Sequence, residues 1–332
     1  MIPYLWLTDA SARLAPYIHQ TPLTYDSELD LYLKWENRQL TGSFKIRGAF
    51  NKVLTLQPWE RERGLVAASA GNHGQGLALA GSQTGAHVIV FASEHAVPAK
   101  LAAMRQLGAE VRLVPGGYGE AEAAGLAYAH DHSATWVSAY NDGQVISGQG
   151  TLGLETLAQL ASLANKPDRP VPWVIPVGGG GLAAGIACAL FCNPQNEPGA
   201  QRLVGVQPEA SPFFHAIFHL GSQAGQMELP TLADGLAGPV EDNSLTIPIL
   251  KRYLDDFVLV SEDEIQQAIG FAWKRYGEVI EGSAAAALAA VLSGRIPERP
   301  AVVVLSGGNI QPELHSRLCA AYQTPPQKTS LV

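Results

Sequence analysis

Residues 173–191 read WVIPVGGGGLAAGIACALF, an apolar run followed by four glycines and a second run of apolar and small residues. The first run is typical of a buried strand, and the second is long enough for a helix. A strand that is apolar throughout is covered on both faces, as in a parallel sheet flanked by helices. The stretch therefore predicts one strand–loop–helix unit of an α/β fold.

The same order of an apolar run and a helical run recurs along the chain. AHVIVFAS precedes PAKLAAMRQLG, EVRLVPGG precedes GEAEAAGLAYAHDH, and RLVGVQPEA precedes SPFFHAIFHLG. This alternation predicts an α/β protein built around mainly parallel sheets. We expect two lobes, with residues 53–145 forming a small domain and residues 1–52 and 146–332 a large one.

Composition limits the classes of function. The 332 residues hold 22 basic and 30 acidic side chains, a net charge of −8 that argues against nucleic acid or an anionic membrane as partner. No apolar run reaches the length of a membrane span, and the start lacks the pattern of a signal peptide, so we expect a cytoplasmic location. Cys188 and Cys192 lie four residues apart, but without a histidine or a second cysteine pair they indicate packing rather than a metal site.

The four glycines, Gly178 to Gly181, form the strongest candidate anion site. Glycines let backbone N–H groups approach an oxyanion closely, and the start of a helix adds a favourable dipole. Two other interpretations stay open, a purely structural turn and a dinucleotide fingerprint made of Gly179, Gly181 and Ala184 with Glu209 as the ribose-binding acid. Because no Lys-Ser/Thr pair ends the motif, it does not indicate a nucleoside triphosphate site.

A lysine stands at the predicted start of another helix. In QLTGSFKIRGAFN, residues 39–51, Thr41 and Ser43 are suitable capping residues and Lys45 follows in an apolar setting. Burial and the positive end of a helix both disfavour the charged amine, so they lower its pKa and make it a nucleophile able to form a Schiff base. The alternative is a lysine on the solvated face of an ordinary helix.

Two further strand ends carry polar residues. VAASAGNHGQG, residues 66–76, predicts a helix entrance at which backbone amides, Ser69 and Asn72 hold a carboxylate, although a simple helix cap fits as well. His73 is a candidate base there, but a histidine at a helix start more typically caps the helix or supports other site residues. Ser306 follows the apolar run at 301–305 without the elbow of a hydrolase nucleophile, which favours a hydrogen-bonding role.

Taken together, these groups suit one ligand pair. Pyridoxal phosphate joined to an amino acid has an aldehyde, a phosphate, a carboxylate and a ring nitrogen, and the sequence offers a partner for each. Tyr140 and residues 211–215 are candidates for the wall around the substrate side chain.

The segments TGSFKIRGA, SAGNHGQG, ISGQGTLGLE, VGGGGLAAGIA and LSGGN occur in this order and closely resemble the fold type II family of pyridoxal-phosphate enzymes, in the threonine/serine dehydratase and serine racemase branch. The resemblance implies a tryptophan synthase β-like fold, a homodimer, and Lys45 as the residue that binds the cofactor covalently. The implied contacts to the cofactor are Phe44, Lys45, Asn72, Gly178, Gly179, Gly180, Gly181, Leu182, Gly235 and Ser306, and those to the substrate carboxylate are Ser69, Gly71, Asn72 and His73.

Two departures from the family pattern bear on the reaction. Racemases of this branch have a serine as second base where this chain has Ala70, which carries no proton. Relatives that bind a divalent cation have acids where this chain has Gln207 and Phe213, so we expect no metal. The chain also ends soon after LSGGN, so we do not expect the regulatory domain of biosynthetic relatives.

The sequence thus predicts a pyridoxal-phosphate-dependent ammonia-lyase that converts a β-hydroxy amino acid, with L-threonine or L-serine foremost, into a 2-oxo acid and ammonia. Lys45 would act as the base at the α-carbon. The alternatives are a serine racemase, a hydroxyaspartate dehydratase and a β-replacement enzyme, and, from another class, a dinucleotide-binding dehydrogenase. The sequence does not fix which substrate side chain is preferred.

Overall fold

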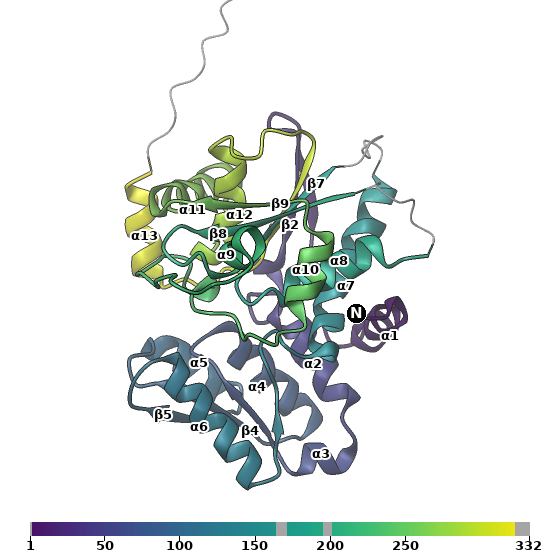
Figure 1. Cartoon of the computed structure of the whole chain (residues 1–332), viewed down its shortest axis with the longest axis vertical. Coiled ribbons are helices and arrows are strands. Elements are labelled where there is room, and N and C mark those ends of the chain that lie inside the picture. The colour runs from purple at the N-terminus through teal and green to yellow at the C-terminus, as the bar shows by residue number, and fades with distance from the viewer. Residues whose placement is uncertain (1, 164–170, 195–200, 323–332) are drawn as a thin grey trace, which may run out of the picture.

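The chain folds into two lobes, each built around its own sheet (Figure 1). The computed structural model describes residues 2–163, 171–194 and 201–322. Residue 1 and residues 164–170, 195–200 and 323–332, which fall within the predicted large domain, lie outside the described residues. The α/β fold with two mainly parallel sheets confirms the fold class predicted from the alternating runs.

The larger sheet has six strands in the order β1-β2-β10-β7-β8-β9. Only the edge pair of β1 and β2 is antiparallel, and the other neighbours run parallel. All residues of the central strands β10 and β7 are buried, as expected from their apolar sequences. The strands are β1 (Leu23–Asp26), β2 (Leu31–Trp35), β7 (Pro172–Pro176), β8 (Arg202–Pro208), β9 (Asp256–Val260) and β10 (Ala301–Leu305).

The smaller sheet has four parallel strands in the order β5-β4-β3-β6. Alternate residues of β4 face opposite sides, so that Val88 and Val90 pack with α4, whereas Ile89 and Phe91 pack with α6. The elements of this lobe are β3 (Leu65–Ala68), α4 (Asn72–Thr84), β4 (Val88–Ser93), α5 (Pro98–Gln106), β5 (Glu110–Val114), α6 (Tyr118–Asp131) and β6 (Thr135–Trp136).

Helices cover both faces of the larger sheet. The alanine-rich α12 (Gly282–Leu292) is buried along nearly its whole length against the sheet. The remaining helices are α1 (Tyr4–Leu14), η1 (Glu36–Arg38), α2 (Lys45–Thr55), α3 (Pro58–Glu62), α7 (Gly143–Ser162), α8 (Gly181–Phe191), α9 (Phe213–Leu220), η2 (Asp234–Leu236), α10 (Thr246–Tyr253), α11 (Glu262–Tyr276) and α13 (Pro312–Ala320). No helix within the described ranges is both long enough and apolar enough to span a membrane.

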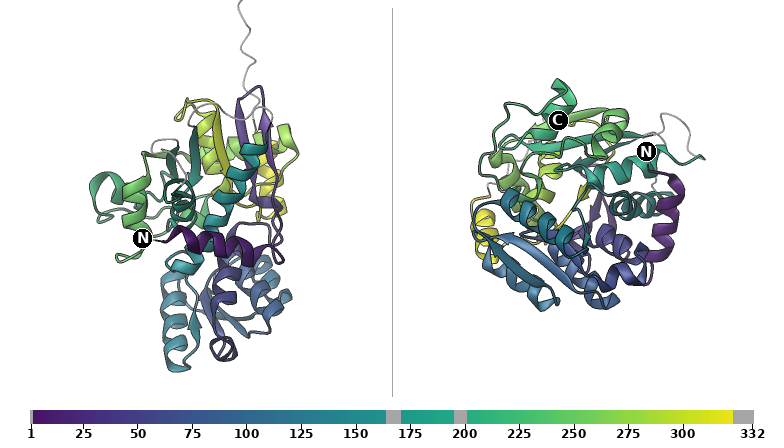
Figure 2. Two further views of the ribbon diagram at one scale, coloured as in Figure 1. Left: turned by 90° about the vertical axis from the view of Figure 1, so that its right-hand side faces the viewer. Right: turned by 60° about the horizontal axis from the view of Figure 1, so that its bottom comes forward.

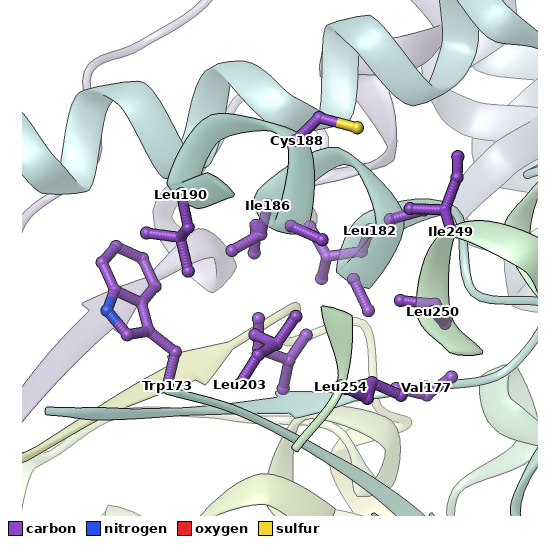
Figure 3. Packing of buried hydrophobic residues seen from close by; sticks show 14 of the residues in the cluster. Trp173, Val177, Leu182, Ile186, Cys188, Leu190, Leu203, Ile249, Leu250 and Leu254 are labelled. Carbon is purple, nitrogen blue, oxygen red and sulfur yellow. The ribbon is translucent and has the colours of Figure 1, made fainter. Parts of the chain in front are cut away.

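A tightly packed apolar cluster fixes α8 on the sheet (Figure 3). Leu182 and Ile186 of α8 lie over Trp173 and Leu203 of the strands below, and α10 closes one side. Cys188 is fully buried in this cluster, and Cys192 is partly buried against it, which confirms the packing interpretation of this pair. Because α8 cannot shift easily within such packing, the loop that precedes it is held in place.

The two lobes meet around α2, which packs against α4 of the small lobe and α7 of the large one. The helix α1 lies across this junction (Figure 2). A cluster of buried charges ties α2 to its neighbours: Arg47 bonds to Glu36 at 2.8 Å and to Glu155 at 3.0 Å, and Glu155 also pairs with Lys34. The position of the first turn of α2, and of the lysine in it, is therefore fixed by paired charges from β2, η1 and α7.

Candidate active site

The glycine loop between β7 and α8 is a tight backbone cradle. Gly180 has a φ of +87°, a conformation that favours glycine, and a Cβ atom there would lie 2.8 Å from the ring of Phe214. On Gly179 a Cβ atom would lie 2.5 Å from the ring of Tyr140. Only glycine fits at these positions of the loop, which directly precedes the N-terminus of an 11-residue helix. This arrangement is suited to binding a phosphate through backbone amides.

The other side of this loop is formed by η2, which is bonded to the first turn of α12. A Cβ atom on Gly178 would lie 3.1 Å from the carbonyl oxygen of Gly235, and the amide of Gly235 donates to the hydroxyl of Ser283 at 3.0 Å. The Thr246 hydroxyl donates to the carbonyl oxygen of Gly179 at 2.7 Å. The structure thus brings Gly235 against the glycine loop, as the family resemblance implies for a residue lining the same site.

Lys45 begins α2, but the predicted capping by Thr41 and Ser43 is wrong. The N-cap position is Phe44, and no side chain caps the helix. Instead the amide of Phe44 donates to the carbonyl oxygen of Ser306 at 3.1 Å, and Ser43 forms a bridge with Gly307. The end of strand β10 therefore holds the helix start, so that the first turn of α2, which carries Lys45, lies beside Ser306 although the two are far apart in sequence.

The amine of Lys45 is held in a low-polarity environment. Its Nζ atom donates to the carbonyl oxygen of Ala139 at 3.1 Å and lies 5.2 Å from the centre of the Phe44 ring. Burial lowers the pKa of Lys45 to about 8, although the carboxyl of Glu281 opposes this shift. Ala139 adjoins Tyr140, whose ring lies against Gly179, so the amine and the glycine cradle share one neighbouring segment.

The loop between β3 and α4 is organised by Ser69. The hydroxyl of Ser69 accepts hydrogen bonds from the amides of Gly71 at 3.1 Å and Gly74 at 3.0 Å. In this structure Ser69 therefore shapes the loop from within. Ala70 is exposed beside it.

The side chain of Asn72 crosses from this loop to the large lobe. Its Nδ2 donates to Glu281 at 2.7 Å, and its Oδ1 accepts from Asn309 at 2.7 Å. Both partners lie beside the end of β10, since the amide of Glu281 donates to the carbonyl oxygen of Gly307 at 3.0 Å and Asn309 follows Gly308. Asn72 thus links the predicted carboxylate loop to the region of Ser306.

His73 lies in the same helix entrance but is almost completely buried. Its Nε2 bonds to the carbonyl oxygen of Val137 at 2.9 Å, and its Nδ1 has no partner. Burial, and secondarily the charge of Lys45, lowers the pKa of His73 to about 4. A neutral ring that is bonded to the nearby segment at Val137 agrees better with a supporting role than with that of a base.

The predicted site residues lie at one place, the junction of the lobes beside the ends of β3, β7 and β10. Glu209 does not join them: its side chain is half exposed and pairs with Arg295. Gln207 is buried, and its Oε1 accepts from the amide of His215 at 2.8 Å. In the part of the chain that the structure describes, no group of three or more histidine, cysteine or acidic residues is placed to hold a metal ion.

Sequence reasoning missed three charged residues near the site. Glu281 is buried, and burial together with Asp234 raises the pKa of its carboxyl to about 7. Lys100 of α5 and Asp234 of η2 form an ion pair across the junction at 2.6 Å. The one available signal was the position of Glu281 immediately before a fully apolar helix, where an acid is either a cap or buried for another reason.

These residues fit a cofactor that carries a phosphate and an aldehyde. The glycine cradle leaves no room for a Cβ atom, and the amine of Lys45, with a pKa of about 8, is partly in its neutral form at physiological pH. The buried hydroxyl of Ser43, two residues before Lys45, has no hydrogen-bond partner. The fold and the site therefore define an α/β protein able to bind a phosphate noncovalently and an aldehyde as a Schiff base.

Residues 14–307 match the family of pyridoxal-phosphate dependent enzymes, and the chain belongs to this family. This assignment rules out the dinucleotide-binding alternative. The chain is 40% identical to the L-threonine ammonia-lyase of Thermotoga maritima, over 94% of this chain and 77% of that protein.

Solved structures of similar proteins agree with the assignment. A threonine deaminase from T.th. superposes with a TM-score of 0.84 at 35% identity and covers 93% of this chain and 99% of its own. A serine racemase from Dictyostelium discoideum superposes with a TM-score of 0.81 at 32% identity and covers the same shares of the two chains.

Proposed function

We propose that the protein is a pyridoxal-phosphate-dependent ammonia-lyase that converts L-threonine or L-serine into a 2-oxo acid and ammonia. The observation that carries the proposal is the meeting of three features at one junction: the amine of Lys45, the glycine cradle before α8 and the amide-rich loop at residues 69–73. Two of the similar proteins described above are named for the deamination of threonine.

Each feature has a task in this reaction. The amides of residues 178–182 hold the phosphate, and the loop at residues 69–73 binds the substrate carboxylate. When bound, the cofactor supplies an electron-poor ring that stabilises negative charge at the α-carbon of the substrate. Lys45 Nζ, with a pKa of about 8, exists partly as the neutral amine near pH 7 and accepts the α-proton.

The residues around the cofactor ring favour elimination. Ser306 has a neutral hydroxyl, and we propose that it meets the ring nitrogen, where it stabilises a positive charge less than a carboxylate does. Racemisation needs a second proton carrier on the opposite face, and Ala70 supplies none. The other proposed contacts are Phe44, Asn72, Leu182 and Gly235 for the cofactor and Ser69, Gly71, Asn72 and His73 for the substrate carboxylate.

The test is a substrate panel with the purified holoenzyme. We expect L-threonine or L-serine to release ammonia and the matching 2-oxo acid, and Lys45→Ala to abolish the release. Lys274→Ala, which changes an exposed lysine on α11, is the matched control and retains activity. Exclusive turnover of hydroxyaspartate, formation of D-serine, or a thioether product from an added thiol would each replace the proposal with one of its alternatives.

Four further features belong to the same proposal. The small domain comprises residues 53–145, the protein forms a homodimer without a bound metal, and it works in the cytoplasm. All three cysteines are free thiols in the structure, which suits a reducing compartment. The dimer follows from the family resemblance, and sedimentation of the holoenzyme tests it.

A further inference from the structure

Lys100 and Asp234 form a charged contact between the two lobes. Lys100 lies in α5 of the small lobe, the lower lobe in Figure 1, and Asp234 begins η2 of the large lobe. The Nζ atom of Lys100 lies 2.6 Å from Oδ2 of Asp234. The proposed reaction uses neither residue.

The two ends of this pair adjoin the proposed substrate and cofactor sites. A Cβ atom on Gly71 would lie 3.8 Å from Cδ of Lys100, so the lysine stem runs along the loop that is proposed to bind the substrate carboxylate. Asp234 immediately precedes Gly235, which lies against the glycine loop. The ion pair therefore joins the substrate side of the junction to the cofactor side.

The large-lobe end of the pair is firmly fixed. Leu236 of η2 and the preceding Ala233 are buried, and the amide of Gly235 is bonded to Ser283 in the first turn of α12. The small-lobe end depends on α5, which packs against α4 and β5. Relative movement of the lobes would thus act directly on the Lys100–Asp234 contact.

We propose that Lys100 and Asp234 form an interlobe latch, which holds the loop at residues 69–73 against the large lobe and so increases affinity for the amino-acid substrate. The inference rests on the proposed function for the identity of the ligand. Lys100 is a positioning residue here, because it acts through the loop and through Asp234.

The exposure of the pair suits a contact that opens and closes. The side chain of Asp234 is 59% exposed and that of Lys100 is 18% exposed. Ion pairs in contact with solvent contribute little free energy. Breaking this one is therefore expected to change the equilibrium between the closed and open lobes by roughly fivefold at most. Asn72 also crosses to the large lobe, through its bonds with Glu281 and Asn309, and this second contact is expected to limit the movement when the latch opens.

The test compares three variants by steady-state kinetics of the holoenzyme. Lys100→Met and Asp234→Asn are each expected to raise KM for the amino-acid substrate by roughly twofold to fivefold, with kcat within about twofold of the wild type. The charge-reversed double variant, Lys100→Asp with Asp234→Lys, restores KM towards the wild-type value. Arg202→Gln breaks the exposed pair with Glu298 in the large lobe and serves as the control without effect.

A second readout does not depend on turnover. Hydrogen exchange of the holo-protein should become faster at residues 69–77 and 98–106 in both single variants and return towards normal in the double variant. If no amino acid is turned over, this result still supports the latch, so failure of the proposed function and failure of the latch are distinguishable. Lys100→Arg, which keeps the charge, should exchange like the wild type.

Two outcomes overturn the inference. If Lys100→Met raises KM while Asp234→Asn lowers it or leaves it unchanged, Lys100 binds the substrate directly and Asp234 merely competes for it. If neither single variant changes KM or hydrogen exchange, the ion pair has no effect on the junction. Failure of the double variant to improve on the single variants excludes the latch as well.

Discussion

Lys45, which is partly buried, and Glu281, which is buried, are two titratable groups whose charges act on each other across the site. Burial lowers the pKa of Lys45 to about 8 and raises that of Glu281 to about 7. Each group opposes the shift of the other, because an ionised carboxyl stabilises the ammonium form. Glu281 therefore helps to set the pH at which the amine of Lys45 becomes a nucleophile.

This coupling predicts the pH dependence of amine reactivity in the apoprotein. The rate at which an acylating reagent modifies Lys45 should rise with pH to a midpoint near 8, as the neutral amine forms. Glu281→Gln should move this midpoint to lower pH, since the carboxylate that stabilises the ammonium is lost. Mass spectrometry of the peptide that contains Lys45 measures the extent of reaction.

Glu298→Gln provides the control for this experiment, because Glu298 is exposed and pairs with Arg202. It should leave the midpoint unchanged. A midpoint near that of a free lysine, about 10.4, or a rise in the midpoint in Glu281→Gln, would contradict the electrostatic account of the site.

Some of the site residues could be predicted from the sequence and others could not, for a physical reason. Lys45 and Ser306 were predicted because Lys45 stands at a helix start and Ser306 at a strand end, positions that are typical of ligand-binding residues. Glu281 was not, because its importance comes from its contact with Asn72, 209 residues away. The capping prediction for Thr41 and Ser43 failed for a similar reason, since a distant strand end holds the start of α2.

Among the elements, the loop between β7 and α8 depends most strictly on residue type. A side chain at Gly180 would meet Phe214, Leu250 and Thr246 as well as the strain of a positive φ. Gly221 has a similar φ of +84° but nothing within 4 Å of its Cβ position. Substitutions at these two glycines can therefore distinguish the effect of backbone strain from the effect of filling the cradle.

We predict that Gly180→Ala and Gly221→Ala both lower the free energy of unfolding, by about 1–2 kcal/mol for the strain alone. Only Gly180→Ala should weaken binding of pyridoxal phosphate, because its methyl group displaces the walls of the cradle. Cofactor titration followed by absorbance, together with urea unfolding, measures both effects. Equal cofactor affinity in the two variants would mean that the glycine loop does not hold the phosphate.

The strands and helices were easier to predict from the sequence than the order in which the strands pair. The apolar runs at β4, β7 and β10 indicated buried strands because their own residues are suited to a covered sheet. The order of the strands was not predictable in this way. β2 pairs with β10, residue 31 with residue 301, and such pairing depends on contacts between distant parts of the chain.

For the whole molecule, the buried charges around Arg47 hold the helix that carries Lys45 on the large lobe, where the two lobes meet. Arg47 and Glu36 have fully buried side chains, and Glu155 is nearly buried. Removing one member of such a cluster leaves a buried charge without its partner, which costs more than the pair itself contributes. The cluster thus places the reactive lysine by excluding alternative positions of α2.

Arg47→Met is therefore expected to lower the free energy of unfolding by about 3–5 kcal/mol. Arg202→Met, which breaks an exposed pair, should change it by less than about 1 kcal/mol. Urea denaturation of both variants at pH 7 provides the measurement. A similar small effect in both would show that the charges at the junction contribute no more than surface pairs do.

The proposed chemistry requires that Lys45 is the residue to which the cofactor is bound. Borohydride reduction of the holoenzyme, followed by peptide mapping, identifies this residue, because reduction makes a Schiff base permanent. We predict that the mass of a pyridoxyl phosphate group is found on Lys45. Finding that group on a different lysine, or finding Lys45 unmodified in protein saturated with the cofactor, would contradict the account.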